Sequence, residues 1–496
     1  MSTSSSSEKA DTFDQGNHVE NVTNETLTLE HREYLIERHG TVDLEPLPSM
    51  DPVDPLNWPS WKKNVNLFLV SFHALMTTFT AASIIPAFED LSIALDVSLT
   101  EASYLTAIQI LILGVSPLFW KPISNTYGRR PIWLLSTFGS MVCNIGCSES
   151  KSYATQVVTR ILVAFFISPA IAISSAVVAE TFFKRERGLK MGVWTVMVTL
   201  GPPTGPFIMG FVVYHTGNWQ WIYRILAITN FVQFILYFFL SHETLYVRHP
   251  NTPTSTLTRI PSIAFQQISK HPLSAADFWR PLTLAKYPTI ILPTIAYSLV
   301  FSFAGILMTV EIPQIFTPAF GFNAQQIGLQ FIGMIIGSIL GEQIGGRGSD
   351  FIMRPKKSSL PRKPEYRLFL SYPGYLCAIV GIIVFCVQTD SAAEKGRWDV
   401  TPIVGIAIAA FGNQIVTTVI TTYCVDCHAE VAGSVGVFIN LVRSTWGFIG
   451  PFWFPDMFDN LGLKGSAGLM VGILAVFSVL PTMWIQWRGE RVRNKE

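Results

Sequence analysis

Few ionisable side chains lie within the long apolar segments of this 496-residue sequence, and these residues could do chemistry. Arg160 and Arg443 lie inside two such segments, and Glu311 lies near the end of a third. A charge at the centre of a bilayer costs at least about 2.5 kcal/mol on insertion scales, so such residues are typical of proton or substrate pathways. A carboxyl group can gain and lose a proton there, and a guanidinium group can bind an anionic or carbonyl-bearing group.

Glu311 is the first candidate for a proton-carrying group, because it lies near the predicted outer end of its segment and could take a proton from outside. The alternative is an acid at the membrane interface that touches water. His73 is a second titratable candidate, although a single helical histidine is more often a packing residue. Arg443 has Asn440 three residues before it, on the same face of a helix, and the pair could bind substrate.

Other charged residues near segment ends have simpler interpretations. Arg224 is close enough to an interface to reach water. Asp426 and Glu180 are expected to pair with arginines of the loops, and Glu342 lies toward the predicted cytoplasmic end of its segment.

The sequence has no pattern typical of an enzyme or of ATP-driven transport. Cys424 and Cys427 form a CxxC, but its neighbourhood lacks further metal ligands, which favours simple packing. No GxxxxGK[ST] phosphate-binding loop occurs. The net charge of +1 gives no indication of nucleic-acid binding. We therefore expect no metal, no cofactor and no nucleic-acid partner.

The elements that must position these residues are about a dozen apolar stretches, each long enough to span a bilayer, which takes roughly 20 residues. Hydrophobic residues make up 49% of the chain, and charged residues make up 14%, against about 25% in soluble domains. The sequence therefore predicts an all-α membrane protein with 12 transmembrane helices in two six-helix bundles. Their centres lie near Leu75, Leu111, Leu135, Ile167, Thr199, Phe231, Val300, Gly333, Ala378, Ile408, Trp446 and Phe477.

The distribution of Lys and Arg over the loops predicts the orientation. With a cytoplasmic N-terminus and twelve crossings, the inside loops hold 25 of these residues and the outside loops hold 4, so both termini are predicted to be cytoplasmic. The expected parts are a disordered cytoplasmic tail (1–60), an N-terminal half (61–246), a central cytoplasmic loop (247–287), a C-terminal half (288–487) and a cytoplasmic C-terminal tail (488–496).

Several motifs occur in order along the chain, and two of them indicate an internal duplication. Tyr127-Gly-Arg-Arg130 and Gly345-Gly-Arg-Gly-Ser-Asp350 occupy matching loops of the two halves, as in transporters built from repeats. The full set is Asp54-Pro-Leu-Asn-Trp-Pro59, Lys121-Pro-Ile-Ser-Asn-Thr-Tyr-Gly-Arg-Arg130, Thr159-Arg-Ile-Leu-Val163, Gly201-Pro-Pro-Thr-Gly-Pro206 and Glu243-Thr-Leu-Tyr246. Together they resemble the major facilitator superfamily, specifically its fungal twelve-span drug:proton antiporter branch, over residues 51 to about 490.

The resemblance implies a gate in the loop between helices two and three. Arg129 and Arg130 would take part in it, with the alternative that they are ordinary orientation signals. The family usually has glycine where this chain has Lys121 and an acid where it has Asn125. Because Asn125 cannot form an ion pair, the balance between conformations could depend more on Asp350 in the second half.

The resemblance also implies roles for other helices. Arg160 matches the arginine of helix four that is linked to proton coupling in the family. The alternative is that Arg160 belongs to a structural polar network. Gly201, Gly205 and Pro206 belong to the antiporter motif of helix five, which accompanies antiport rather than symport. Gln414 and Tyr423 would face substrate from helix ten.

We interpret the chain as a carrier that moves a small molecule by alternating access, driven by proton antiport. The expected cargo is a drug or a fungal secondary metabolite, and the expected partners are protons and the lipid bilayer of the cell membrane, with the protein acting as a monomer. The first alternative is a proton-coupled importer of polyamines, cations or nutrients, which would need acids in its cavity. A non-transporting membrane sensor is the second alternative.

Overall fold

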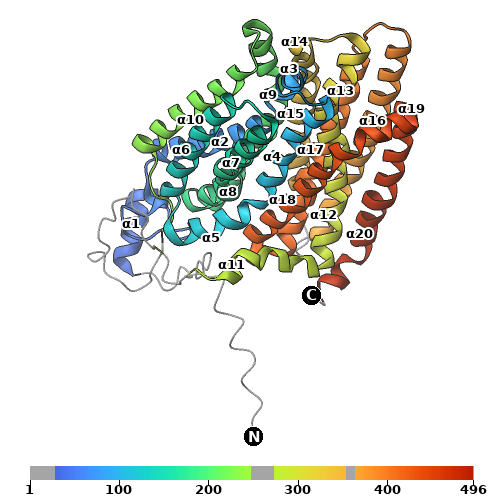
Figure 1. Cartoon of the computed structure of the whole chain (residues 1–496). Coiled ribbons are helices and arrows are strands. Elements are labelled where there is room, and N and C mark those ends of the chain that lie inside the picture. Colours follow the sequence, from blue (N-terminus) through green and yellow to red (C-terminus); the bar gives the residue numbers. More distant parts are fainter. Residues whose placement is uncertain (1–27, 247–267, 269–272, 354–362, 495) are drawn as a thin grey trace.

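The computed structural model describes residues 28–246, 268, 273–353, 363–494 and 496. Apart from turns and connections, these residues form helices, as the sequence predicts. Figure 1 shows two bundles side by side, with the first half of the chain in blue to green and the second half in yellow to red. The helix α1, the short helix α11 and the C-terminus lie at one end of the bundles, called here the terminal end, and α3 and α14 lie at the other, called the distal end.

The N-terminal bundle is built from apolar helices broken at prolines, glycines and capping residues. Its helices are α2 (Ser60–Ala82), α3 (Phe88–Leu95), α4 (Leu99–Val115), α5 (Pro117–Tyr127), α6 (Arg130–Ser148), α7 (Tyr153–Ile167), α8 (Pro169–Thr181), α9 (Lys184–Thr216) and α10 (Gln220–Leu240). Two of the breaks, α4 to α5 and α7 to α8, fall directly before Pro117 and Pro169, because proline cannot donate the backbone hydrogen bond that would continue the preceding turn.

The C-terminal bundle follows α11 (Ala275–Trp279). Its helices are α12 (Pro288–Phe301), α13 (Met308–Phe320), α14 (Ala324–Gln330), α15 (Ile332–Met353), α16 (Ser371–Glu394), α17 (Thr401–Cys427), α18 (Ala432–Ile449), α19 (Phe454–Leu474) and α20 (Leu480–Arg493). Two π-helical turns, Ser302–Leu307 and Ala475–Val479, join α12 to α13 and α19 to α20.

Nine helices of the described residues are long and apolar enough to cross a membrane, or ten when the pair α4 and α5, bent by 40°, counts as one span. The helices at two predicted centres, α6 near Leu135 and α18 near Trp446, are not among them. Both contain several small polar residues, and α18 also contains Asn440 and Arg443. The apolar spans are therefore confirmed, and the number twelve remains a prediction.

The prediction of a disordered tail over residues 1–60 is wrong for residues 28–60, whereas residues 1–27 lie outside the described residues. Helix α1 (Leu29–His39) is capped by Thr28 and ends at Gly40 in the left-handed region. The Arg38 guanidinium and the His39 ring bond to Asn57, and the Tyr246 hydroxyl donates to Asp51. Polar contacts with neighbouring motifs thus order a segment that has little apolar periodicity.

The two bundles meet along α9, which packs against α14 and α15, and along α4, which packs against α18. No residue of α9 between Lys184 and Leu200 is buried, whereas Gly201, Gly205, Gly210 and Val213 in its distal part are. Stacked rings of Tyr104 and Phe452, with centroids 4.3 Å apart, add a distal contact. Along α9, the halves are therefore packed together more tightly toward the distal end, whereas α4 stays close to α18 as far as Gly114 and Ser444.

Candidate functional site

Glu311 lies in α13 and is 1% exposed, so its carboxyl group does not touch water in this structure. Gln314 Nε2 donates to Glu311 Oε2 at 2.9 Å, and the Thr100 hydroxyl of α4 donates to Gln314 Oε1 at 3.1 Å. The other carboxyl oxygen, Oε1, is buried without a hydrogen-bond partner. These three residues, called the Glu311 bridge, connect a buried carboxyl group of the C-terminal half to a helix of the N-terminal half.

Glu342 forms a second bridge from α15, in the second half of the apolar span Ala324–Met353. Gln414 Nε2 and the Thr418 hydroxyl, both from α17, donate to Glu342 Oε2 at 2.6 and 2.8 Å. Gln414 Nε2 also donates to the Thr199 hydroxyl of α9 at 3.2 Å. Glu342, Gln414, Thr418 and Thr199 are called the Glu342 bridge. Sequence reasoning placed Gln414 in the cavity but missed its carboxylate partner, although Glu342 is the one acid within its apolar segment before Asp350.

Arg443 and Asn440 form the pair that their spacing predicts. Arg443 Nη2 donates to Asn440 Oδ1 at 2.6 Å, and Nη1 donates to the Tyr297 hydroxyl at 3.1 Å. The guanidinium also lies over the Phe301 ring, 4.6 Å from its centroid. Asn440 Nδ2 donates across the halves to the Leu113 carbonyl at 3.0 Å. Arg443 is partly exposed and its described partners are all neutral, so an anionic or carbonyl group could complete its hydrogen bonds.

Arg160 is 1% exposed and lies inside the N-terminal bundle. Its Nε donates to the Leu105 carbonyl of α4 at 3.0 Å, and its Nη2 donates to the Ala81 carbonyl of α2 at 3.1 Å. Its Nη1 lies 3.5 Å from the Tyr223 hydroxyl of α10. Arg160 thus links α7 to three other helices of its own half, the geometry of a structural polar network, and it has no described contact with either bridge.

The antiporter motif brings α9 close to α2. A Cβ atom at Gly201 would lie 2.7 Å from the Leu75 carbonyl oxygen, and one at Gly205 would lie 2.8 Å from the Phe79 carbonyl oxygen. Pro202 cannot donate to the Val198 carbonyl one turn earlier, and the Thr78 hydroxyl of α2 donates to that oxygen instead at 2.9 Å. Pro206 lies in the same buried stretch, and glycine is needed here because the helices touch at their backbones.

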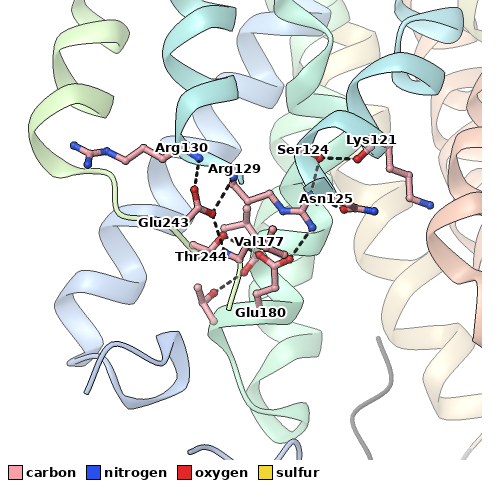
Figure 2. A network of polar contacts seen from close by, with 11 residues as sticks. Lys121, Ser124, Asn125, Arg129, Arg130, Val177, Glu180, Glu243 and Thr244 are labelled. Atoms are coloured by element: carbon pink, nitrogen blue, oxygen red, sulfur yellow. Dashed lines mark hydrogen bonds and ion pairs between the residues drawn. The ribbon is translucent and has the colours of Figure 1, made fainter. Parts of the chain in front are cut away.

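The loop residues Arg129 and Arg130 lie in a network at the terminal end of the first half (Figure 2). Arg129 donates to Asn125 Oδ1 at 2.7 Å and pairs with Glu180 at 2.8 Å. The Glu243 carboxylate accepts the backbone N–H groups of Arg129 and Arg130, at 2.9 and 3.0 Å, and so caps the start of α6. Asn125 therefore binds the Arg129 guanidinium as a neutral hydrogen-bond acceptor, and Glu180 is the acid that forms the ion pair with it.

The sequence predicts that Gly345–Asp350 forms a loop matching Tyr127–Arg130, but the structure places these residues inside α15, whose helix continues to Met353. Asp350 there lies 3.3 Å from Arg367. The same guanidinium pairs with Asp426 at 2.6 Å. Glu180 and Asp426 end the fourth and tenth predicted segments and each pairs with a loop arginine, as predicted. Between the halves at this end, Lys121 Nζ donates to the Ser434 hydroxyl of α18 at 3.2 Å.

Two predicted residues lie away from the region between the halves. Tyr423 is fully buried, and its hydroxyl lies 3.3 Å from where a Cβ atom of Gly489 in α20 would be. It faces the outer helices of the second half and not α9, so the structure does not bring it together with Gln414. His73 is also fully buried, between the Tyr237 and Ser136 hydroxyls, which is the geometry of a packing residue.

Cys424 and Cys427 are free thiols, and Cys424 is buried. In the part of the chain that the structure describes, no three His, Cys, Asp or Glu side chains are grouped so that they could hold a metal ion. The candidate site therefore consists of the two carboxylate bridges and the Arg443 pair.

The sequence is similar to a known protein family and to several transporters. The model of the Major Facilitator Superfamily matches residues 67–451. A protein called MFS transporter fsa7, from Fusarium sp. strain FN080326, is 28% identical over 90% of this chain and 88% of its own length. The efflux pump radE of Floropilus chiversii is 27% identical over 90% of this chain and 83% of its own length. The multidrug transporter TPO1_2 of Candida glabrata is 25% identical over 90% and 78%.

A solved structure, of the human organic anion transporter MFSD10 (TETRAN), has the same fold. It aligns with a TM-score of 0.57 over 86% of this chain and 99% of its own, at 16% identity. At this identity the likeness shows the fold alone.

Proposed function

Because this chain belongs to the major facilitator superfamily and is a membrane transporter rather than an enzyme, we propose that it exports a drug or a secondary metabolite in exchange for protons. The observation that carries the proposal is the Glu311 bridge. A carboxyl group that is 1% exposed, with one oxygen lacking any donor, is poorly stabilised as an anion inside an apolar bundle. Such a group is suited to bind a proton in one conformation and release it in another.

Export is favoured over import by the relatives. Two of them are called efflux pump and multidrug transporter, and both align over nine-tenths of this chain. The glycines and prolines of α9 fit the antiporter motif, and their close contacts with α2 let α9 move with the N-terminal half as one body.

Transport would proceed by alternating access, with two six-helix halves rocking about a site near the middle of the membrane. The tight distal packing of α9 and its unburied terminal part support a conformation that opens toward the terminal end. We infer a monomer with twelve spans in the cell membrane and with both termini in the cytoplasm. In that orientation the terminal end faces the cytoplasm, so the conformation is inward-facing. The contacts of Arg129 with Asn125, of Arg130 with Glu243 and of Asp350 with Arg367 would then belong to the cytoplasmic gate.

Arg443 and Asn440 would hold the polar group of the substrate, and Gln414 would contribute from α17. Phe301, stacked on the Arg443 guanidinium, adds an apolar surface for a flat or amphipathic molecule. We keep Arg160 as a residue needed for coupling, acting through the arrangement of the N-terminal bundle, since its partners lie on α2, α4 and α10.

A proton-coupled importer of polyamines is the second candidate, because Glu311 and Glu342 both lie on helices next to the opposite half. Carboxylates in that position could bind an ammonium group in place of a proton.

One experiment separates these candidates. Cells with and without the gene are loaded with rhodamine 6G or with labelled spermine, and inside-out membrane vesicles are tested with and without an imposed pH gradient. Export predicts less dye in expressing cells and gradient-driven dye uptake by vesicles. More spermine in expressing cells, with no effect on the dye, would replace export by import. Dye transport that ignores the pH gradient would contradict proton antiport.

A further inference from the structure

Arg443 carries a positive charge inside α18 and has no acidic partner among the described residues. Of the elements packed against α18, α12 and the π-helical turn after it contain no acid. Glu101 of α4 lies in the first turn at the distal start of that helix, and Asp426 of α17 pairs with Arg367. Glu430 is exposed and precedes Arg443 by about three helical turns. An unneutralised charge in a membrane bundle is costly, which indicates a ligand for it.

The Arg443 guanidinium has hydrogen-bond donors to spare. Of its five N–H groups, one on Nη2 donates to Asn440 and one on Nη1 donates to Tyr297. Nε is buried and has no partner in the part of the chain that the structure describes. One further N–H group on each Nη also has no described acceptor, and the side chain is half-buried. A planar fork of this kind matches the two oxygens of a carboxylate.

Phe301 and Asn413 extend the site on the sides of α12 and α17. The Phe301 ring lies against the guanidinium, with its centroid 4.6 Å away. A Cβ atom at Gly305 would lie 3.4 Å from Phe301 Cδ2 and 3.6 Å from Asn413 Nδ2, so the ring edge and the amide flank the same point. Asn413 Oδ1 is buried and has no partner among the described residues. Because buried polar groups normally have partners, this amide also indicates a ligand.

The site lies where α18 meets the N-terminal half. Asn440 donates to a backbone carbonyl of α4. One turn beyond Arg443, a Cβ atom at Gly447 would lie 3.3 Å from Phe301 Cε1 and 3.4 Å from Ile110 Cγ2 of α4. Arg443 is therefore placed between two contacts of α18 with the opposite half. A ligand bound to it would be covered or uncovered as the halves rock.

We propose that the cargo is an aromatic carboxylate, whose anionic group binds Arg443 and Asn413 and whose ring system packs against Phe301. The inference rests on the proposed function, because it names the class of molecule that the exporter carries. A polyamine would be repelled here, since an ammonium group would lie beside an unneutralised guanidinium.

The test compares rhodamine 6G, which is an ethyl ester, with the free acid that has the same ring system. Full-length protein in lipid nanodiscs is titrated with each dye at about pH 7.5, where a carboxyl group is ionised. Binding is measured by fluorescence anisotropy, with empty nanodiscs as the blank. We expect the dissociation constant of the acid to be at least about tenfold lower, because the ester offers the guanidinium only a neutral carbonyl oxygen.

Arg443→Gln should reduce the preference for the acid to within about twofold. Arg443→Lys keeps the charge without the fork, should keep part of the preference, and replaces Arg443→Gln in the test if that variant does not fold. Asn413→Leu should weaken binding of the acid about threefold. The matched control is Arg488→Gln on α20. Arg488 also lies over an aromatic ring, 5.2 Å from the Trp487 centroid, but it is exposed, so the preference should equal that of wild type.

Failure of the wild type to prefer the acid, or a preference that persists in Arg443→Gln, would overturn the inference. Gradient-driven export of rhodamine 6G would then still support the proposed function. An Arg443-dependent preference for the acid, in a protein whose vesicle transport ignores the pH gradient, would support the carboxylate site and contradict proton antiport.

Discussion

The Glu311 and Glu342 bridges use the same three residue types, a glutamate and a glutamine of the C-terminal half and a threonine of the N-terminal half, but solvate the carboxyl group differently. Glu311 has one donor and one buried oxygen with no partner, whereas Glu342 has two donors on one oxygen. An anion is costly at the first position and well bound at the second. Two glutamates buried in helices can therefore differ in how well their ionised carboxylates are stabilised, because the fold supplies a different number of hydrogen-bond donors to each.

The largest expected effect is that of Glu311→Gln, which cannot carry a proton at the poorly solvated position. We expect gradient-driven dye transport in vesicles to fall roughly hundredfold, about 2.7 kcal/mol in transition-state free energy. The control is Glu394→Gln, at an exposed carboxylate that pairs with Lys464 on the outside of the bundle. An unchanged pH dependence in Glu311→Gln would remove the difference between the two bridges.

Arg160→Ala tests a buried charge whose contacts stay within one half. Removing it deletes the bonds that join α7 to the Leu105 and Ala81 carbonyls and leaves a buried cavity, and we expect roughly 2–3 kcal/mol of lost stability, measured as a lower thermal unfolding midpoint in detergent. Arg160→Lys should recover part of the loss. If Arg160→Ala were as stable as wild type and yet lost its pH-dependent transport, Arg160 would be a direct coupling residue comparable to Glu311.

Gly210→Ala tests the distal contact of α9 with α14, a helix that packs against α13, which contains Glu311. A Cβ atom there would lie 2.5 Å from the Ala324 carbonyl oxygen of α14, so α9 and α14 must separate. Overpacking of this kind costs about 1–2 kcal/mol, and we expect transport to fall about tenfold. Gly188→Ala is the matched control on the same helix, since a Cβ atom there has no heavy atom within 4 Å. Equal activity of the two variants would show that the distal contact is not needed.

The smallest effect is expected for Gln314→Leu, which breaks the Glu311 bridge but leaves its carboxyl group. Loss of one hydrogen bond in an already poorly solvated site should change dye transport by about threefold, near 0.7 kcal/mol. Gln414→Leu should reduce dye transport more than Gln314→Leu, because it removes the two hydrogen bonds that the Gln414 amide donates to Thr199 and Glu342. The reverse order would mean that the Glu311 bridge holds the halves together more strongly.

Much of the site was predictable because its charged and polar residues lie within or at the ends of apolar segments, where such residues are rare. Arg443 and Asn440 were paired correctly from a spacing of three, since a helix puts such residues on one face. The pairing of Glu180 and Asp426 with loop arginines followed from their places at segment ends. The interpretation of Tyr423 as a cavity residue failed in this conformation, because the face of α17 that it occupies turns toward α20.

The sequence by itself determined that this is an all-helical membrane protein, which of its residues are costly in lipid, and which family it resembles, because hydropathy and motif order are properties of the chain alone. Tertiary structure decided which buried charges face the other half. Arg160 and Glu342 both lie in apolar helices, yet one bonds within its own bundle and the other reaches across. That distinction depends on how each helix is rotated against its neighbours, and helix periodicity specifies a shared face without specifying what packs on it.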